Sequence, residues 1–317
     1  MYRSFVLFFL VLFCIHTTTQ ALPLKNTPIH HVIYITVDGI RWQDVFLDRT
    51  RLPKLWQKYA AKGIFYGEPD GQSVIEVASI PYSMPSYQSQ LAGVVLPCSD
   101  NFCKRLSVET FPEKMIHYLQ LEKKDVAVFS SWLGIKRASE HIAGTVFGNY
   151  GNTWMGDPKT HLPDPIMLYF NQKQTLDPAE FFDRYDQYTF AQALHYFEKY
   201  QPRFLWIALN DADVAAHQGD SIRYYQILSS YDDMFDALLS SLSNLGLDHE
   251  TLVIFTTDHG RGNGKYWTEH GPSYPESKKT WAFVLNGQLK PLYKQEDISY
   301  YSTLSIRPTI ENTLEIY

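Results

Sequence analysis

Apolar runs of six or seven residues recur along this chain, and carboxylate and imidazole side chains closely follow them. Runs of this length bounded by polar residues are typical of buried strands in a parallel sheet. Because the carboxyl ends of parallel strands meet at one edge of a sheet, the side chains that follow them are expected to gather there. The runs and the groups that follow them are 31–37 with Asp38, 204–209 with Asp213 and His217, and 252–257 with Asp258 and His259.

Helical segments alternate with these apolar runs along the whole chain. The alternation predicts an α/β fold in which a largely parallel central sheet carries helices on both faces. Segment 145–177 is rich in Gly, Asn, Pro and Asp, and we expect it to form a long surface excursion. Helices are expected at 52–62, 83–93, 111–122, 178–200, 220–244 and after Pro308, and further strands at 126–129 and 280–285.

The first residues indicate an exported protein. Arg3 gives a positive start, 5–15 an apolar core and Ala21 a small residue at the cleavage position, as in a secretory signal peptide. The apolar core is short for a bilayer span, so no stable membrane anchor is expected. We therefore predict a signal peptide at 1–21 and one domain at 22–317, located in the periplasm or secreted.

Charge and cysteine content narrow the function classes further. The net charge of −6 and the lack of a basic run argue against binding to duplex nucleic acid, because phosphate contacts dominate that binding. Cys98 and Cys103 are the cysteines left after removal of the predicted signal peptide. Such a close pair forms a disulfide in an oxidising compartment and would be free in the cytosol, so we predict a bridge.

The polar clusters have both ordinary and functional interpretations. Asp38 before Gly39 fits a common turn, and Asp213 with His217 fits a surface pair on one helical face. Clusters of this kind at three strand ends instead favour a hydrolytic metal site, since Asp and His are zinc ligands and buried charges need partners. Ser83, at an expected helix start, is a candidate nucleophile beside them.

Taken in order along the chain, these motifs resemble the signature of the alkaline phosphatase superfamily. Within it the chain most resembles small exported bacterial alkaline-phosphatase-like proteins near the nucleotide pyrophosphatase/phosphodiesterase branch. Each motif is modest alone, but five in family order are specific, and the resemblance extends from about residue 30 to the C-terminus. The motifs are Thr36–Gly39, Ser83–Tyr87 with Leu91–Gly93, Asp213 with His217, Thr257–Gly260 and Glu269–Gly271.

The resemblance implies a hydrolase of small phosphate esters with two zinc ions, or other divalent metals, and a covalent phosphoseryl intermediate on Ser83. The helix start at Ser83 would lend backbone N–H groups to the phosphoryl oxygens, although a simple helix-capping serine is the alternative. Asn101 falls roughly where phosphodiesterase relatives place a phosphate-contacting asparagine, and an ordinary loop residue is the alternative. The implied ligands are Asp38, Ser83, Asp258 and His259 for one metal and Asp213, His217 and His270 for the other.

Two other functions compete with this one. Ser83–Tyr87 also resembles the sulfatase maturation motif, but Tyr87 replaces the arginine of that motif. Three histidines among the expected ligands favour zinc over the calcium that oxygen ligands hold in sulfatases. A catalytically inactive binding protein on the same fold is the second alternative, and the competent residues at every ligand position and at the nucleophile position argue against it.

Nearby cations and aromatic residues bear on the substrate. Arg41 and Arg261 adjoin expected ligands and could contact a phosphoryl group or pair with carboxylates, and Lys136 with Arg137 could do likewise or face solvent. Monoesters need extra positive charge, whereas diesters suit an apolar or aromatic pocket. Aromatic residues such as Trp132 favour the latter slightly, and the choice stays open at this point.

Overall fold

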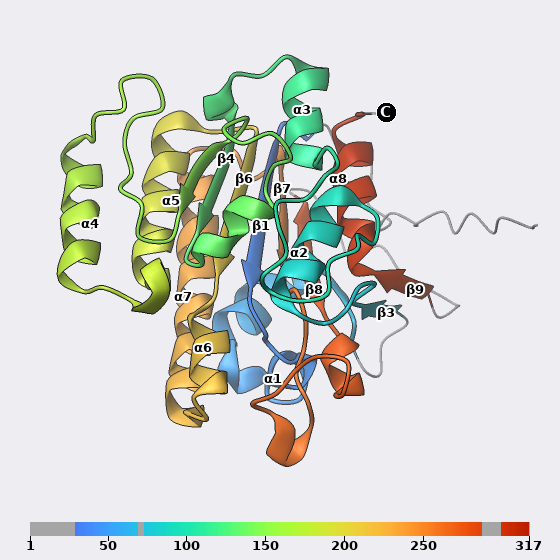
Figure 1. Ribbon diagram of the computed structural model, residues 1–317. Helices are drawn as coiled ribbons and strands as arrows, with labels where there is room; N and C mark the ends of the chain where they lie inside the picture. Colours follow the sequence, from blue (N-terminus) through green and yellow to red (C-terminus); the bar gives the residue numbers. More distant parts are fainter. Residues whose placement is uncertain (1–28, 69–72, 287–298, 317) are drawn as a thin grey trace, which may run out of the picture.

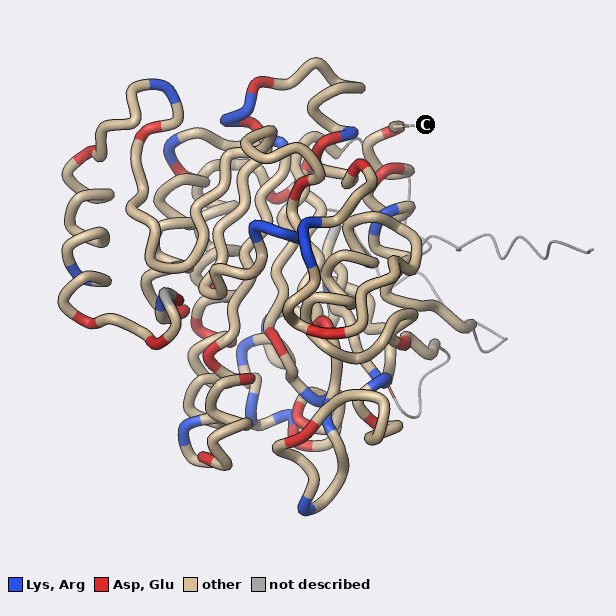
Figure 2. The backbone as a smooth tube through the Cα atoms, in the orientation of Figure 1, with Lys and Arg blue, Asp and Glu red and all other residues tan. Residues whose placement is uncertain are grey.

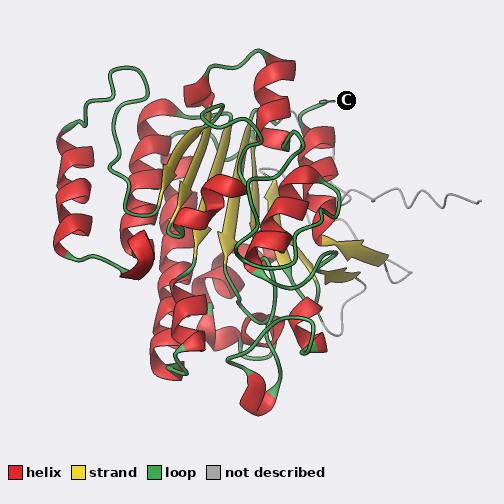
Figure 3. Cartoon of the chain, viewed as in Figure 1, coloured by secondary structure: helices red, strands yellow, loops and turns green. Residues whose placement is uncertain are grey.

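The computed structural model describes residues 29–68, 73–286 and 299–316, so the predicted signal peptide lies outside the described residues. A central sheet lies between layers of helices (Figures 1 and 3). Its seven strands follow the order β2-β8-β7-β1-β6-β4-β5. They are β1 (His31–Val37), β2 (Ile64–Tyr66), β4 (Val126–Ser130), β5 (Phe147–Tyr150), β6 (Phe204–Leu209), β7 (Thr251–Thr256) and β8 (Ala282–Asn286).

Most of the sheet is parallel, as predicted. β1 pairs in parallel with β6 and β7, and β4 pairs in parallel with β5 and β6. β8 is antiparallel to β7, and β2 is antiparallel to β8, so the exceptions lie at one side of the sheet. A separate two-stranded parallel sheet joins β3 (Ser73–Glu76) to β9 (Ser299–Ser302).

Helices cover both faces of the sheet, because the side chains of its strands alternate between two buried cores. In β1, Ile33 and Ile35 lie in one core and Val32 and Tyr34 in the other. α5 and α7 contribute to the first core, and α2, α3 and α8 to the second. The helices are α1 (Trp42–Phe46), α2 (Ser83–Ala92), α3 (Phe111–Leu119), α4 (Pro165–Leu176), α5 (Asp186–Tyr200), α6 (Asp211–His217), α7 (Ser221–Asn244) and α8 (Ile306–Thr313).

The expected surface excursion at 145–177 is wrong in part, because this segment contains β5 and α4. β5 extends the sheet beside β4, and α4 packs against α5 on the outside of the molecule. Asp164 begins α4 by accepting hydrogen bonds from the backbone N–H groups of Ile166 and Met167, and Pro165 lies in the first turn. This cap and proline are ordinary signals of a helix start that the dense turn residues around them obscured.

Three other helices differ from the expectation, two in where they begin and one in its type. α5 begins at Asp186 rather than at 178, and α8 begins at Ile306, before Pro308. The predicted helix at 52–62 is a π-helical turn followed by a 3₁₀ turn. These differences leave the order of strands and helices unchanged, so they do not alter the position of the candidate site.

Charged residues of both signs are interspersed over the loops and helices, whereas the central strands carry few of them (Figure 2). Among the described residues, no helix is both long enough and apolar enough to cross a bilayer. The predicted disulfide between Cys98 and Cys103 is present, with a Cα–Cα separation of 5.7 Å.

Candidate metal centre

The predicted site residues meet at the edge where the central strands β1, β6 and β7 end. Asp38 follows β1, and α6 begins two residues after β6 and carries Asp213 and His217. Asp258 and His259 lie in the loop after β7. The strand ends are in register, so side chains that are distant in sequence come together without a long excursion of the backbone.

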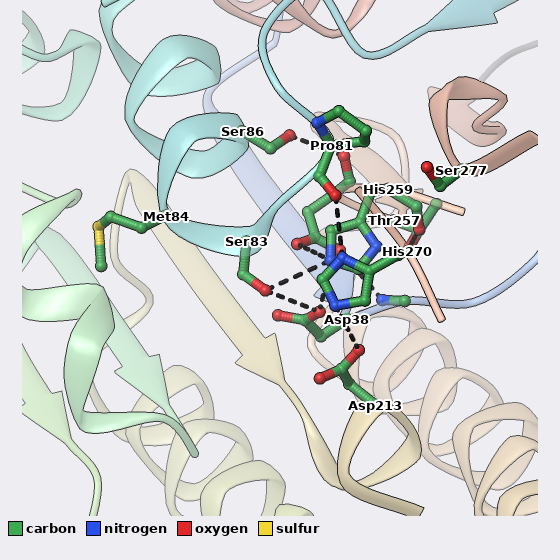
Figure 4. A network of polar contacts seen from close by, with 12 residues as sticks. Asp38, Pro81, Ser83, Met84, Ser86, Asp213, Thr257, His259, His270 and Ser277 are labelled. Carbon is green, nitrogen blue, oxygen red and sulfur yellow. Dashed lines mark hydrogen bonds and ion pairs between the residues drawn. The ribbon is translucent and has the colours of Figure 1, made fainter. Parts of the chain in front are cut away.

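Ser83 and His270 reach this edge from other segments. Ser83 is the first residue of α2 and points toward Asp38, whereas Met84 points away from the cluster (Figure 4). The Nδ1 atom of His270 lies 2.9 Å from the carbonyl oxygen of Pro81. If Nδ1 donates its proton there, Nε2 is left with a free lone pair, which is the state that metal coordination requires.

Asp38, Ser83, Asp258 and His259 form a group that we call the inner cluster. Ser83 Oγ lies 3.3 Å from both Asp38 Oδ1 and His259 Nε2. His259 Nε2 lies 3.4 Å from Asp38 Oδ1 and from Asp258 Oδ2. Four ligands about 2.0–2.1 Å from a tetrahedral zinc ion lie about 3.3 Å from one another. These four separations match that spacing. Asp38 and His259 also offer ligand atoms within 4.8 Å of one on Asp213, so the two clusters adjoin.

The charges of the inner cluster also fit a cation. All four residues are at least 96% buried. Burial and the nearby Asp258 carboxylate raise the pKa of Asp38 well above its usual value, and burial raises the pKa of Asp258 to about 7. Burial lowers the pKa of His259 to about 4, so its imidazole is neutral near pH 7 and cannot balance the negative charge of the two carboxylates. The buried Asp258 Oδ2 atom has no hydrogen-bond partner in the described structure. A divalent metal would satisfy it.

Asp213, His217 and His270 form a second group, the outer cluster. His217 Nε2 lies 3.3 Å from Asp213 Oδ2 and 3.0 Å from His270 Nε2. The side chain of His217 is 44% exposed, whereas that of His270 is 5% exposed. These three side chains offer two imidazole nitrogens and one carboxylate oxygen on the open side of the site, which suits a metal with room for a substrate.

Arg261 holds the outer cluster and is not available to a substrate. Its buried guanidinium pairs with Asp213 Oδ1 and donates to the carbonyl oxygens of Gly39 and Thr268. Although burial opposes ionisation, Arg261 and the neighbouring histidines hold the pKa of Asp213 well below its usual value. Arg41 likewise pairs with Asp44 at 2.7 Å. For both arginines the structure therefore supports pairing with carboxylates rather than contact with a phosphoryl group.

Gly39 joins the two clusters through its backbone. Its N–H donates to Asp258 Oδ1 at 3.0 Å, and its carbonyl oxygen accepts from Arg261 Nε at 3.1 Å. The residue has φ +65°, and a Cβ atom there would lie 2.6 Å from Asp213 Oδ1. Both the backbone conformation and the space require glycine.

The start of α2 differs from the expectation in the number of backbone donors that it offers. Tyr82 is the N-cap residue, so the Ser83 hydroxyl is not the helix cap. Met84 N–H already donates to Asn101 Oδ1 at 2.9 Å, and Pro85 has no N–H. Of the first three helical residues, only Ser83 has a backbone N–H without a hydrogen bond in the described structure. The start of α2 therefore offers an anion fewer backbone N–H donors than the sequence led us to expect.

One family model matches about half of the chain. Residues 122–278 match the model of the type I phosphodiesterase / nucleotide pyrophosphatase family. This stretch carries Asp213, His217, Asp258, His259 and His270, and it begins after Ser83 and Asn101. A search of curated proteins gave no match.

Solved structures show the same fold at low sequence identity. The chain matches TAB5 alkaline phosphatase (TM-score 0.51, 12% identity, covering 92% of this chain and 99% of that one). It also matches the 2-O GAG sulfatase BT1596 (0.59, 13%, 92% and 71%) and the lipoteichoic acid synthase LtaP from Listeria monocytogenes (0.57, 10%, 92% and 73%). The alkaline-phosphatase-like fold and the resemblance to that superfamily are thus confirmed.

Proposed function

We propose that this chain, which has the alkaline-phosphatase-like fold, is a two-metal phosphoric ester hydrolase with Ser83 as its nucleophile. The observation that carries the proposal is the geometry of the inner cluster. Ser83 Oγ lies 3.3 Å from both Asp38 Oδ1 and His259 Nε2, and those two atoms lie 3.4 Å from each other. A serine needs activation to act as a nucleophile, and a metal or an adjacent base supplies it. In this cluster the Asp38 carboxylate and the His259 imidazole, both candidate metal ligands, lie 3.3 Å from the same hydroxyl.

Two zinc ions, or other divalent metals, would act here as Lewis acids and lower the pKa of the serine hydroxyl. The inner cluster would hold one and the outer cluster the other, as the resemblance implied. Ser83 Oγ then loses its proton and bonds to phosphorus as one ester oxygen leaves and takes up a proton. A monoester leaves a phosphoseryl intermediate, a diester leaves a seryl phosphodiester that keeps its second ester group, and water hydrolyses the bond to Ser83 in either case. The Ser83 N–H and the carboxamide of Asn101 would donate hydrogen bonds to the phosphoryl oxygens.

We further propose that diesters are preferred over monoesters. A monoester presents an additional negative charge, which needs a cation near the nucleophile. Arg261 pairs with Asp213, Arg41 pairs with Asp44, and Arg137 donates to backbone carbonyls, so these guanidinium groups are engaged elsewhere. The match to a phosphodiesterase family model supports the same preference.

The alternatives and the location follow from the same residues. A sulfatase would need a calcium-type site of oxygen ligands, whereas three imidazoles converge here. A binding protein would not need a serine oriented toward a metal site.

We also propose that the protein is exported, which the disulfide and the sequence at 1–21 support.

The test is Ser83→Ala, assayed with bis-p-nitrophenyl phosphate and p-nitrophenyl phosphate in parallel. Loss of a covalent nucleophile is expected to lower turnover at least about a thousandfold. Folding should persist, because the hydroxyl does not cap α2. The wild type should favour the diester. At low pH Ser83 should carry a trappable p-nitrophenyl phosphoryl group from the diester and a phosphoryl group from the monoester. Turnover by the variant near the wild-type rate would exclude Ser83 as nucleophile.

A further inference from the structure

The guanidinium of Arg137 holds the loop that carries Asn101. Arg137 follows β4 at the same edge of the sheet as the candidate site, at the end of a 3₁₀ turn over Leu133–Arg137. Its Nη2 atom donates to the carbonyl oxygen of Asn101 and its Nη1 atom to that of Cys103, each at 2.9 Å. One planar fork thus fixes two peptide groups of the loop, which a lysine could not do in the same geometry.

The side chain of Asn101 has its orientation set by α2. Its Oδ1 atom accepts the hydrogen bond from Met84 N–H at 2.9 Å, next to Ser83 in the sequence. With the oxygen turned toward the helix, the Nδ2 atom must turn the other way. The two N–H groups of Nδ2 make no hydrogen bond in the described structure, so they are available as donors to a ligand.

The disulfide constrains the same loop from its ends. Cys98 and Cys103 close a six-residue segment around Asn101. Within it, Asp100 Oδ1 accepts from Phe102 N–H at 2.7 Å, which tightens the turn further. The Asn101 backbone is therefore held by the bridge and by Arg137, and its side chain is held by α2.

We propose that Arg137 is a positioning residue for the phosphoryl-binding site and that it acts through Asn101. This inference rests on the proposed function, because it assigns the freed carboxamide N–H groups to a phosphoryl oxygen. Arg137 itself is engaged by the two loop carbonyls. Its removal should change the placement of Asn101 and should not remove a direct contact to the substrate.

The Asn101→Asp variant distinguishes two roles of this side chain, as a hydrogen-bond donor to the substrate and as an acceptor that caps α2. The aspartate can still accept the hydrogen bond from Met84 N–H, and its charge favours a helix N-terminus, so thermal stability should stay equal or rise. It replaces the Nδ2 donor by an anion, so kcat/KM for the diester should fall about a hundredfold or more, as for loss of one oxyanion donor. If activity instead follows stability, Asn101 is only a cap and the proposal fails.

Arg137→Met, combined with Asn101→Ala, tests the route of the effect. Arg137→Met should lower kcat/KM about tenfold, the smaller end of the range for residues that orient a contact. In an Asn101→Ala background the same change should have almost no further effect, since residues acting through one group are not additive. The matched control is Arg105→Met, whose guanidinium binds Glu140 instead and whose kcat/KM should stay within about twofold. Additive losses would contradict the proposal.

Binding of inorganic phosphate to the zinc-loaded protein separates this proposal from the proposed function. Calorimetry should show weaker phosphate binding in Asn101→Asp and Arg137→Met than in the wild type and in Arg105→Met. If the wild type binds phosphate in this pattern but hydrolyses no ester, the positioning role stands and the hydrolase assignment fails. If the wild type hydrolyses esters while all four proteins bind phosphate equally, only the positioning role fails. If the wild type does neither, both fail.

Discussion

The inner and outer clusters lie side by side at one sheet edge, yet they differ in how their buried negative charge is balanced. The inner cluster has two buried carboxylates, Asp38 and Asp258, and neither forms an ion pair with a lysine or arginine in the described structure. The outer cluster has one carboxylate, Asp213, paired with the buried Arg261. The inner cluster therefore depends on a proton or a bound cation for its charge balance, whereas the outer one is partly balanced by the protein itself.

This difference gives the two clusters different roles in the folded, metal-free protein. An unpaired buried carboxylate opposes folding unless it takes up a proton. Removing a carboxylate that is paired with a buried guanidinium destabilises the fold, because it leaves the guanidinium charge uncompensated. The peptide of Gly39 contacts both clusters, through its N–H to Asp258 and through its carbonyl to Arg261. Substitution of Asp213 in the outer cluster and of Asp258 in the inner cluster should therefore change the stability of the metal-free protein in opposite directions.

Asp213→Asn should have the larger effect on the metal-free protein. It removes the partner of a fully buried guanidinium, which costs about 3–5 kcal/mol of unfolding free energy when one member of a buried pair is lost. The pKa of Asp213 is held well below its usual value, so this stability is present at neutral pH and is lost as pH falls through the folded-state pKa. Chemical denaturation in chelator at neutral pH measures it, and Asp233→Asn, at a side chain that is 67% exposed, serves as the control.

Asp258→Asn should stabilise the metal-free protein. The folded-state pKa of Asp258, about 7, lies above the unfolded value, so metal-free stability falls as pH rises from about 4 toward 7. The amide removes this loss and should add about 2–4 kcal/mol at pH 8, with little effect at pH 3. Asp38→Asn should act in the same direction. A decrease in metal-free stability at pH 8 for both variants would contradict the contrast between the clusters.

Much of the site could be predicted because strand ends determine it. Asp38, Asp258 and His259 follow parallel strands directly, and the geometry of a parallel sheet then brings them together. His270 follows no strand, and only the family resemblance indicated it. Its place depends on the contact with Pro81, a residue 189 positions away along the chain.

Other features had no comparable local signal. The link from Arg137 to Asn101 joins two loops 36 residues apart, and no periodicity reports such a contact. The apolar run of β8 looks the same whether the strand is parallel or antiparallel, so its reversed direction was not foreseen. The start of α4 did carry a signal in Asp164 and Pro165, and the abundance of turn residues outweighed it.

Metal content per active chain tests the central claim most directly. The protein, purified without chelator and loaded with zinc, should contain two zinc ions per chain by elemental analysis, and exhaustive chelation should abolish diester hydrolysis until zinc is restored. Asp258→Asn should lose the inner ion and retain the outer one. A content of none or one per active chain, or full activity after exhaustive chelation, would contradict the account of two metal clusters around Ser83.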